Sequence, residues 1–221
     1  MALAEDGWDL AVHYRTSAAD MKRTLDDARA LGVSATMLEG DLGDLETIES
    51  LVDSAFESFP ELQLLINNAS LFPAGSLADT TPEQWDRVMD VNLRAPFILT
   101  QRFAHAIESG SVINLLDAAV NRGRTRFAAY SVSKAGLELL TRLAAREFAP
   151  SIRVNAIAPG PVLPPPGRGE EHLMKVARRS PLRAPVSMDD MVAAMRYLVE
   201  NESVTGDVLY VDGGEHLVGE T

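Results

Sequence analysis

The sequence predicts an α/β fold in which a doubly wound parallel sheet carries helices on both faces, and three observations support this. Short apolar runs typical of strands alternate with longer segments of helical periodicity. The runs at 62–67 and 111–116 are rich in Leu, Ile and Val, as expected of strands buried on both faces. Polar residues follow several strands, where a doubly wound sheet binds ligands. We expect residues 1–221 to form a single domain.

Local signals justify the individual elements. The first long helix ends at Gly32, a residue favoured just after a helix end. Thr81, Pro82 and Gln84 form a helix start, with a threonine cap, proline at the first position and glutamine three residues after the cap. The predicted strands are 8–14, 34–38, 62–67, 111–116, 152–157 and 208–211. The predicted helices are 18–31, 45–59, one beginning after Thr81, 127–148 and 187–198.

Composition excludes several classes of function. The formal charge of −12 argues against nucleic acid or an anionic membrane as a partner. The chain has no cysteine, which excludes disulfides, thiolate metal sites and cysteine nucleophiles, and we expect no metal. No apolar run approaches the roughly 18 residues of a membrane span, and the N-terminus lacks the basic and apolar regions of a signal peptide. We therefore expect a cytoplasmic protein.

The strongest chemical signal is a tyrosine and a lysine one turn apart on the helix 127–148. Tyr130 and Lys134 share one helix face, where an ammonium lowers the pKa of a phenol and makes it a better proton donor. The pattern alone also occurs by chance in helices. Asp117 ends a predicted strand nearby, so the three groups are expected to meet in one crevice. The proline-rich segment 159–169 is expected to cover this site, with a plain surface connection as the alternative.

Together these motifs resemble the short-chain dehydrogenase/reductase family, from about residue 8 to the end of the chain. The motifs that carry the resemblance are Asn67-Asn68-Ala69, Asn92, Tyr130 with Lys134, Asn155-Ala156-Ile157-Ala158-Pro159-Gly160, and Asp212-Gly213-Gly214. The resemblance implies a Rossmann-type fold and a nicotinamide cofactor. It implies that Tyr130 is the catalytic acid/base, that Lys134 binds the nicotinamide ribose, and that Asn92 holds a water in the proton relay. The cofactor would also contact Leu42, Asn68, Ala69, Pro159 and Gly160.

Two positions narrow the resemblance to the pteridine and dihydromonapterin reductases. Asp117 stands where the family usually has a serine, and a carboxylate can bond to a pterin's amino group and ring nitrogens. The alternative for Asp117 is a strand-end residue that caps the next turn. Phe72, close to Ser70, resembles the phenylalanine that packs against the pterin in those enzymes, opposite the nicotinamide. A loop phenylalanine packed on the core is the alternative for Phe72.

The residues after the first predicted strand favour NADPH over NADH. NAD enzymes of this type tend to have an acidic residue there, whereas this chain has Arg15 and Ser17, which suit a 2′-phosphate. Ser17 also stands at the N-cap position of the next helix, and it can serve both roles. Asp41, after the following strand, matches the family's adenine-contacting aspartate, with a plain turn residue as the alternative.

The family begins with a central strand and a glycine-rich turn that binds the pyrophosphate at a helix N-terminus. Residues 1–7 are instead typical of the last turns of that first helix, with Gly7 as its cap. We therefore expect the first strand and the glycine-rich turn, roughly 20–25 residues, to be missing through a misassigned start or because the chain is a fragment. Without that strand the sheet would have a gap with unpaired backbone edges. If the sequence is complete, NADPH binding would be badly weakened.

The sequence thus predicts an NADPH-dependent reductase whose small-molecule substrate is a pterin. A reductase of a carbonyl such as a 3-oxoacyl thioester is the first alternative, and Asp117 and Phe72 count against it. The second is an inactive scaffold of the same fold, which the intact set of polar residues disfavours. Relatives are usually tetramers built on pairs of long helices, so the resemblance implies a homotetramer or homodimer.

Overall fold

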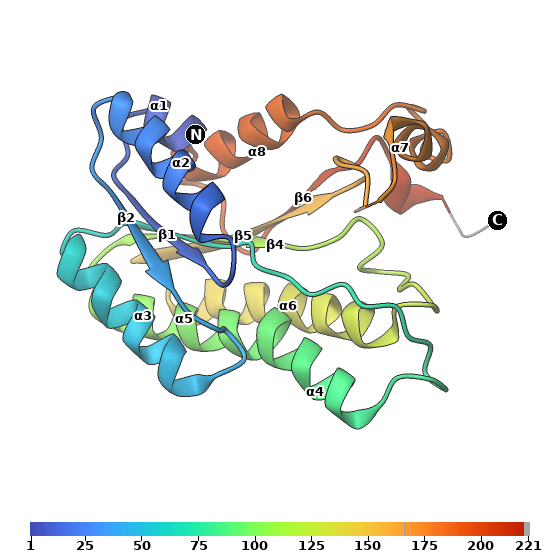
Figure 1. The fold of residues 1–221 in the computed structure, drawn as a ribbon, viewed down its shortest axis with the longest axis horizontal. Helices are drawn as coiled ribbons and strands as arrows, with labels where there is room; N and C mark the ends of the chain where they lie inside the picture. Colours follow the sequence, from blue (N-terminus) through green and yellow to red (C-terminus); the bar gives the residue numbers. More distant parts are fainter. Residues whose placement is uncertain (166, 219–221) are drawn as a thin grey trace.

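The computed structural model describes residues 1–165 and 167–218 and shows the predicted α/β architecture (Figure 1). Its strands are β1 (Leu10–Tyr14), β2 (Ala35–Glu39), β3 (Leu64–Asn67), β4 (Gly110–Leu115), β5 (Ile152–Pro159) and β6 (Val208–Val211). Its helices are α1 (Ala2–Glu5), α2 (Ala18–Ala30), α3 (Leu45–Ser58), α4 (Pro82–Met89), the π-helix η1 (Asp90–Arg94), α5 (Ala95–Ala106), α6 (Ala128–Glu147), α7 (Glu170–Ala177), α8 (Met188–Glu200) and the 3₁₀ helix η2 (Glu215–Leu217). None of the described helices is long and apolar enough to cross a membrane.

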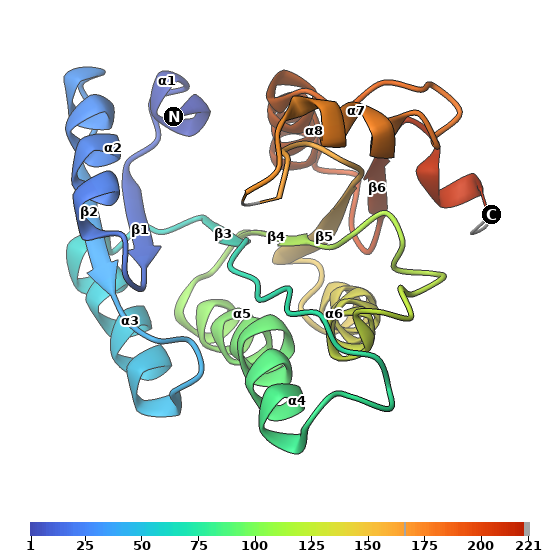
Figure 2. The same cartoon turned by 45° about the vertical axis from the view of Figure 1, so that its right-hand side comes forward.

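The strands form two parallel groups that are not hydrogen-bonded to each other in the described part of the chain. One is the pair β1–β2, and the other is the four-stranded sheet β3–β4–β5–β6. Figure 2 shows the pair and the larger sheet with β1 and β3 facing the space between them. The expected gap in the sheet is therefore present, and it lies between β1 and β3.

Helices cover both faces of the four-stranded sheet, as Figure 1 shows with α5 and α6 on one side and α8 on the other. On the first side, Phe103 of α5 and Ala144 of α6 pack with Val112 and Val154 of the central strands. On the second side, Leu198 of α8 belongs to a cluster with Ile113 and Ile157. Because helices cover both faces, most residues of β4 and β5 are buried.

The helix start at Thr81 and the helix ends at Gly7 and Gly32 follow the predicted signals, and the structure adds a cap at Ser187. Thr81 accepts a hydrogen bond from the Gln84 N–H at the start of α4, and Ser187 forms a reciprocal capping box with Asp190 at α8. Gly7 and Gly32 both take positive φ angles, of 85° and 94°, just after α1 and α2. These glycines end their helices because the left-handed conformation costs them no Cβ clash.

The structure corrects two expectations about local order. The run 62–67 was expected to be buried on both faces, but in β3 only Asn67 is buried, because β3 is an edge strand of its sheet. Helix α7 was not expected at all, since it follows the proline-rich segment directly. Within that segment the described residues after β5 form no helix or strand before α7, and residue 166 lies outside the described residues.

Candidate active site

The expected tyrosine and lysine lie in the first two turns of α6, under the carboxyl end of β4. Both side chains are buried, with 8% of Tyr130 and 3% of Lys134 exposed. The Lys134 ammonium donates a hydrogen bond of 2.6 Å to the Leu115 carbonyl at the end of β4. Its Nζ also lies 5.8 Å from the centroid of the Tyr130 ring. The helix face and the strand end therefore bring these groups together as the spacing predicted.

Asp117 connects the end of β4 to this helix face. Its Oδ2 accepts a hydrogen bond of 3.0 Å from the Tyr130 hydroxyl. Its Oδ1 accepts a hydrogen bond of 2.7 Å from the Ala119 N–H. The second contact is the turn cap that was the alternative for Asp117, so one carboxylate both caps its turn and faces the phenol.

Burial and charge set the proton affinities of this cluster. Burial, together with the neighbouring Asp117 carboxylate, raises the pKa of the Tyr130 phenol well above its usual range. Burial lowers the pKa of Lys134 to about 8. The expectation that Lys134 lowers the pKa of Tyr130 is not confirmed, because Arg124 is the cation that lowers it here. The phenol is thus held as a protonated donor in this structure.

No local sequence pattern indicates Arg124 or its partner Glu215, although both belong to the site. The Arg124 guanidinium lies 3.4 Å from Asp117 Oδ1 and donates a hydrogen bond of 3.1 Å to Glu215 Oε1. Glu215 comes from η2, 91 residues further along the chain. Ion pairs between such distant residues leave no local pattern, so only the fold could reveal them.

Phe72 lies beside the reactive phenol, in the loop after β3. Its ring stacks on Phe127 at 4.1 Å between centroids and 8° between planes. It also meets the Tyr130 ring edge to face at 4.4 Å. Phe72 remains 48% exposed, so it packs on the site's own aromatic rings and still offers surface to a flat ligand.

Asn92 supports the site from behind. It is fully buried in η1, and a π-helical turn is frequent at functional sites. Its amide group pairs with both backbone groups of Leu71, at 2.7 and 2.9 Å, and donates to Ser133 Oγ at 3.1 Å. Asn92 therefore fixes the loop that carries Phe72 to the helix that carries Tyr130.

The residues expected to bind the adenosine end lie after β1 and β2. Arg15 and Ser17 are exposed, and Ser17 occupies the N-cap position of α2 without a capping hydrogen bond from its side chain. Asp41 accepts hydrogen bonds from the Gly43 N–H at 2.8 Å and from Arg87 at 2.7 and 2.8 Å. These bonds hold the pKa of Asp41 below its usual value, with the Gly43 bond as the largest cause. Asp41 therefore makes the turn contact that was its alternative.

The other expected cofactor contacts line the strand ends between these two groups. Asn68, Ala69 and Ser70 are exposed in the loop after β3, whereas Leu42 is buried in a cluster with Ile48. Pro159 is the last residue of β5 and Gly160 follows it, where a Cβ on Gly160 would lie 2.8 Å from the Asp212 Cα. Glycine is required there because two strand ends approach closely.

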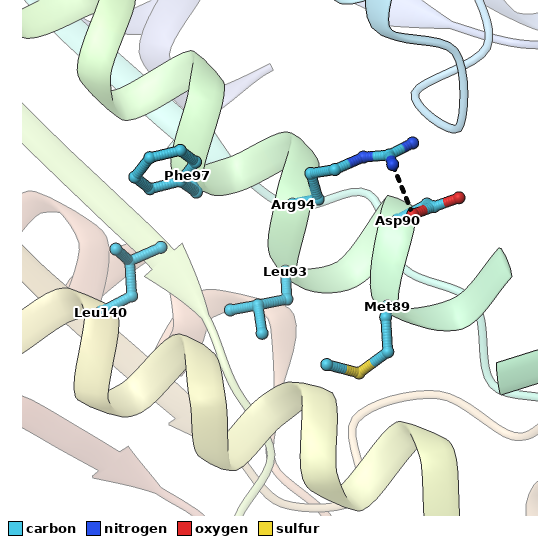
Figure 3. Close-up of a pocket in the computed structure, with 6 residues that line it drawn as sticks. All are labelled: Met89, Asp90, Leu93, Arg94, Phe97 and Leu140. Atoms are coloured by element: carbon cyan, nitrogen blue, oxygen red, sulfur yellow. Dashed lines mark ion pairs between the residues drawn. The ribbon is translucent and has the colours of Figure 1, made fainter. Parts of the chain in front are cut away.

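Two further observations bound the chemistry. The described residues contain no group of three His, Cys, Asp or Glu side chains placed to hold a metal ion. An apolar hollow of about 360 Å³ lies between the α4–η1–α5 segment and α6 and is lined by Met89, Asp90, Leu93, Arg94, Phe97 and Leu140 (Figure 3). It contains none of the residues of the Tyr130 cluster.

Comparison with known proteins agrees with this geometry. Residues 1–216 match the family model described as enoyl-(acyl carrier protein) reductase. FolM alternative dihydrofolate reductase 1 from Brucella canis, complexed with NADP, has a TM-score of 0.92 and 34% identity, over 100% of this chain and 88% of that chain. The same enzyme from Brucella suis, in complex with NADP, has a TM-score of 0.94 and 33% identity, over 100% and 90%. The 3-oxoacyl-(acyl-carrier-protein) reductase FabG of Staphylococcus aureus is 28% identical over 225 residues, 98% of this chain and 92% of FabG.

Proposed function

This chain belongs to the short-chain dehydrogenase/reductase family of oxidoreductases, and we propose that it reduces a pterin from the dihydro to the tetrahydro level with NADPH. The observation that carries the proposal is the hydrogen-bonded pair of Asp117 and Tyr130 with the half-exposed ring of Phe72 beside it. A pterin offers a flat face and an edge of nitrogen donors and acceptors, and this set complements both.

The proposed roles follow from the contacts of each side chain. Tyr130 gives its hydroxyl proton to the ring nitrogen that gains a proton when the neighbouring carbon gains a hydride. Asp117 accepts a hydrogen bond from the Tyr130 hydroxyl through Oδ2 at 3.0 Å and would meet the pterin edge. Lys134 is hydrogen-bonded to Leu115, and burial lowers the pKa of its ammonium to about 8. In the proposed reaction it would bind a ribose hydroxyl. Phe72 orients the flat ring.

The strand ends fit a phosphorylated dinucleotide. Bound NADPH would supply the hydride to the pterin. Arg15 and Ser17 follow β1, and the Ser17 hydroxyl makes no capping hydrogen bond to α2. Both side chains could therefore donate to a 2′-phosphate, which favours charge-assisted donors. Gly160, just after β5 and beside the catalytic cluster, leaves no room for a side chain, because the Asp212 backbone approaches it closely. The FolM enzymes that resemble this chain were solved with NADP, which supports the same cofactor here.

A 3-oxoacyl thioester is the second candidate substrate, because FabG and the matching family model act in acyl-carrier chemistry by their descriptions. The site itself favours the pterin. A thioester offers no flat aromatic face for Phe72 and no row of N–H donors for Asp117. Reduction of its ketone would use a neutral hydroxyl at position 117, where this chain has a carboxylate.

We also place this reaction in the cytoplasm and in a homodimer or homotetramer. The apolar hollow of Figure 3 lies on a surface that exposes large side chains of α5 and α6. Phe97, which lines the hollow, is 46% exposed, and Leu139 and Leu143 of α6 are 56% and 50% exposed. A second copy packed on this surface would bury them.

The test compares two substrates in one assay. NADPH oxidation is followed by the loss of its absorbance, with 7,8-dihydrobiopterin or dihydromonapterin in one reaction and acetoacetyl-CoA in the other. We expect turnover of the pterin, and we expect Asp117→Ser to abolish it while acetoacetyl-CoA reduction stays equal or improves. Asp189→Ser, at an exposed position of α8, is the matched control. Efficient reduction of the thioester without pterin turnover would agree with the family assignment but would overturn the proposed pterin substrate.

A further inference from the structure

Arg124 stands between two carboxylates in the wall of the active site. Its Nη2 lies 3.4 Å from Asp117 Oδ1 and 3.1 Å from Glu215 Oε1. Only 17% of the Asp117 side chain and 12% of the Glu215 side chain is exposed, so solvent screens these charges weakly. The guanidinium therefore joins the carboxylate that faces Tyr130 to a second, more deeply placed one.

The backbone around Arg124 holds the guanidinium in this place. Gly123 turns the chain with a φ of 71°, which glycine adopts without strain. The Arg124 N–H then donates to Ser131 Oγ at 2.8 Å, and the Phe127 N–H donates to the Arg124 carbonyl at 2.8 Å. The loop is thus fastened to the first turn of α6, the turn that carries Tyr130.

The C-terminal turn closes the arrangement from the other side. Glu215 opens η2, where its N–H donates to the Asp212 carbonyl at 3.1 Å. Arg122 also pairs with Glu215, at 3.6 Å, and donates to the Val218 carbonyl. Two arginines of one loop therefore hold one glutamate, and Arg124 alone reaches on to Asp117.

We propose that Arg124 and Glu215 are positioning residues for the reduction: Glu215 holds the Arg124 guanidinium against Asp117, and Arg124 keeps the Asp117 carboxylate turned toward Tyr130. Asp117 has three donors around it, from Ala119, Arg124 and Tyr130. A carboxylate with donors on both oxygens is confined in rotation and presents one fixed edge to a substrate. The inference rests on the proposed function only where it concerns that substrate.

The first test needs no substrate. The Ala119 N–H reports the place of Asp117, because Asp117 Oδ1 is its acceptor at 2.7 Å and Ala119 is buried. We expect Arg124→Met to speed amide hydrogen exchange at Ala119 by about 10-fold, and Arg124→Lys to restore part of the protection. Glu215→Gln should act in the same direction and less strongly. In each variant, the exchange rate of the backbone N–H of residue 124, which donates to Ser131 Oγ, shows whether the loop keeps its fold.

Neighbouring residues of the same type supply the controls. Arg126 belongs to the same loop and is exposed, and Glu202 is exposed after α8. Arg126→Met and Glu202→Gln should leave Ala119 exchange unchanged. If Arg124→Met also leaves it unchanged, or if Arg126→Met changes it equally, the positioning role is overturned whatever the enzyme reduces.

The second test distinguishes an effect on pterin binding from an effect on NADPH binding. With NADPH and 7,8-dihydrobiopterin, Arg124→Met should raise the KM for the pterin by about 10-fold and leave the KM for NADPH within about two-fold. Equal changes in both KM values, in an active enzyme, would contradict positioning through Asp117. If the wild-type chain does not reduce the pterin, the proposed function fails, and the exchange experiment still decides the role of Arg124.

Discussion

The two groups of strands differ in how deeply they are buried. In β4 and β5 most residues are buried between helices on both faces, whereas in β1 only Tyr14 is buried and in β2 none is. The catalytic cluster lies at the end of the buried group, and the residues expected to bind the adenosine phosphate lie at the end of the exposed pair. Under the proposed function, proton transfer would take place where water is excluded, and phosphate would bind where charged side chains stay solvated.

The buried group also carries a polar network that the exposed pair lacks in the described residues. Asn67 donates to Asn114 at 2.8 Å, and Asn114 donates to Thr141 at 2.9 Å, which connects β3, β4 and α6. These side chains are nearly inaccessible. Satisfied buried networks restrict a core to one arrangement, so the catalytic half is expected to be the more rigid of the two.

Removing the Tyr130 hydroxyl tests the comparison most severely. Because a positioned acid typically contributes about 10²- to 10⁴-fold, we expect Tyr130→Phe to lower kcat by that order. The KM for NADPH should change little, since the hydroxyl's bond is to Asp117. Steady-state kinetics with NADPH and a dihydropterin measure the loss, and far-ultraviolet circular dichroism checks the fold. Activity within a few-fold of the parent would mean that the chemistry lies elsewhere.

A pair of matched valine substitutions tests the difference in burial. Val154 in β5 is fully buried, and Val12 in β1 is partly exposed. We expect Val154→Ala to lower the free energy of unfolding by about 1.5–3 kcal/mol, because burying a valine contributes about that much. Val12→Ala should cost less than half as much. Urea unfolding measures both, and equal losses would show that the two groups of strands are equally packed.

The regular elements could be predicted well because their signals are local. The strand 208–211, the cap at Thr81 and the helix end at Gly32 occur where the sequence predicts them. The burial of β3 could not be predicted, since it depends on which strands are neighbours. Helix α7 also escaped prediction, because it has only eight residues and follows a proline-rich segment.

The site divides in the same way. Tyr130, Lys134 and Asp117 were predicted to meet, and the structure brings Asp117 and Lys134 to Tyr130. Phe72 was predicted to face the substrate, and its ring contacts that of Tyr130. Arg124, Glu215 and the stacking partner Phe127 were not predicted. Charge pairs and ring stacks between distant residues depend on three-dimensional approach, which spacing along the chain does not encode. For the same reason the sequence suggested Lys134 as the cation that acts on the phenol, where the structure has Arg124.

Because Lys134 is buried, the free energy of unfolding should depend on pH. Burial lowers its pKa from 10.5 to about 8, so between these values the unfolded chain holds more protons than the folded one. Stability should therefore rise as the pH increases from about 8 to 10.5, and the full cost of burying the charge is present below pH 8. Lys134→Met should raise the free energy of unfolding at pH 7 by about 1–3 kcal/mol.

Urea unfolding at pH 7 and near pH 10 checks this sign, because the gain from Lys134→Met should shrink at the higher pH. Lys22→Met, at an exposed position of α2, is the control and should show neither effect. Destabilisation by Lys134→Met at pH 7 would show that the hydrogen bond to Leu115 outweighs the cost of burial.

The smallest expected effect belongs to the exposed strand pair. Arg15 follows β1 and is exposed, so a phosphate bound there is partly screened and the gain from one guanidinium is modest. We expect Arg15→Ala to raise the KM for NADPH by about 10-fold, because one charge-assisted bond is lost, and to change the KM for NADH by less than about two-fold. Arg23→Ala, another exposed arginine of the same region, controls for the loss of positive charge alone. Raising the salt concentration should reduce the difference between parent and variant, since only an exposed charge is screened strongly. Equal losses with both cofactors would mean that Arg15 supports the fold of β1 and does not read the 2′-phosphate.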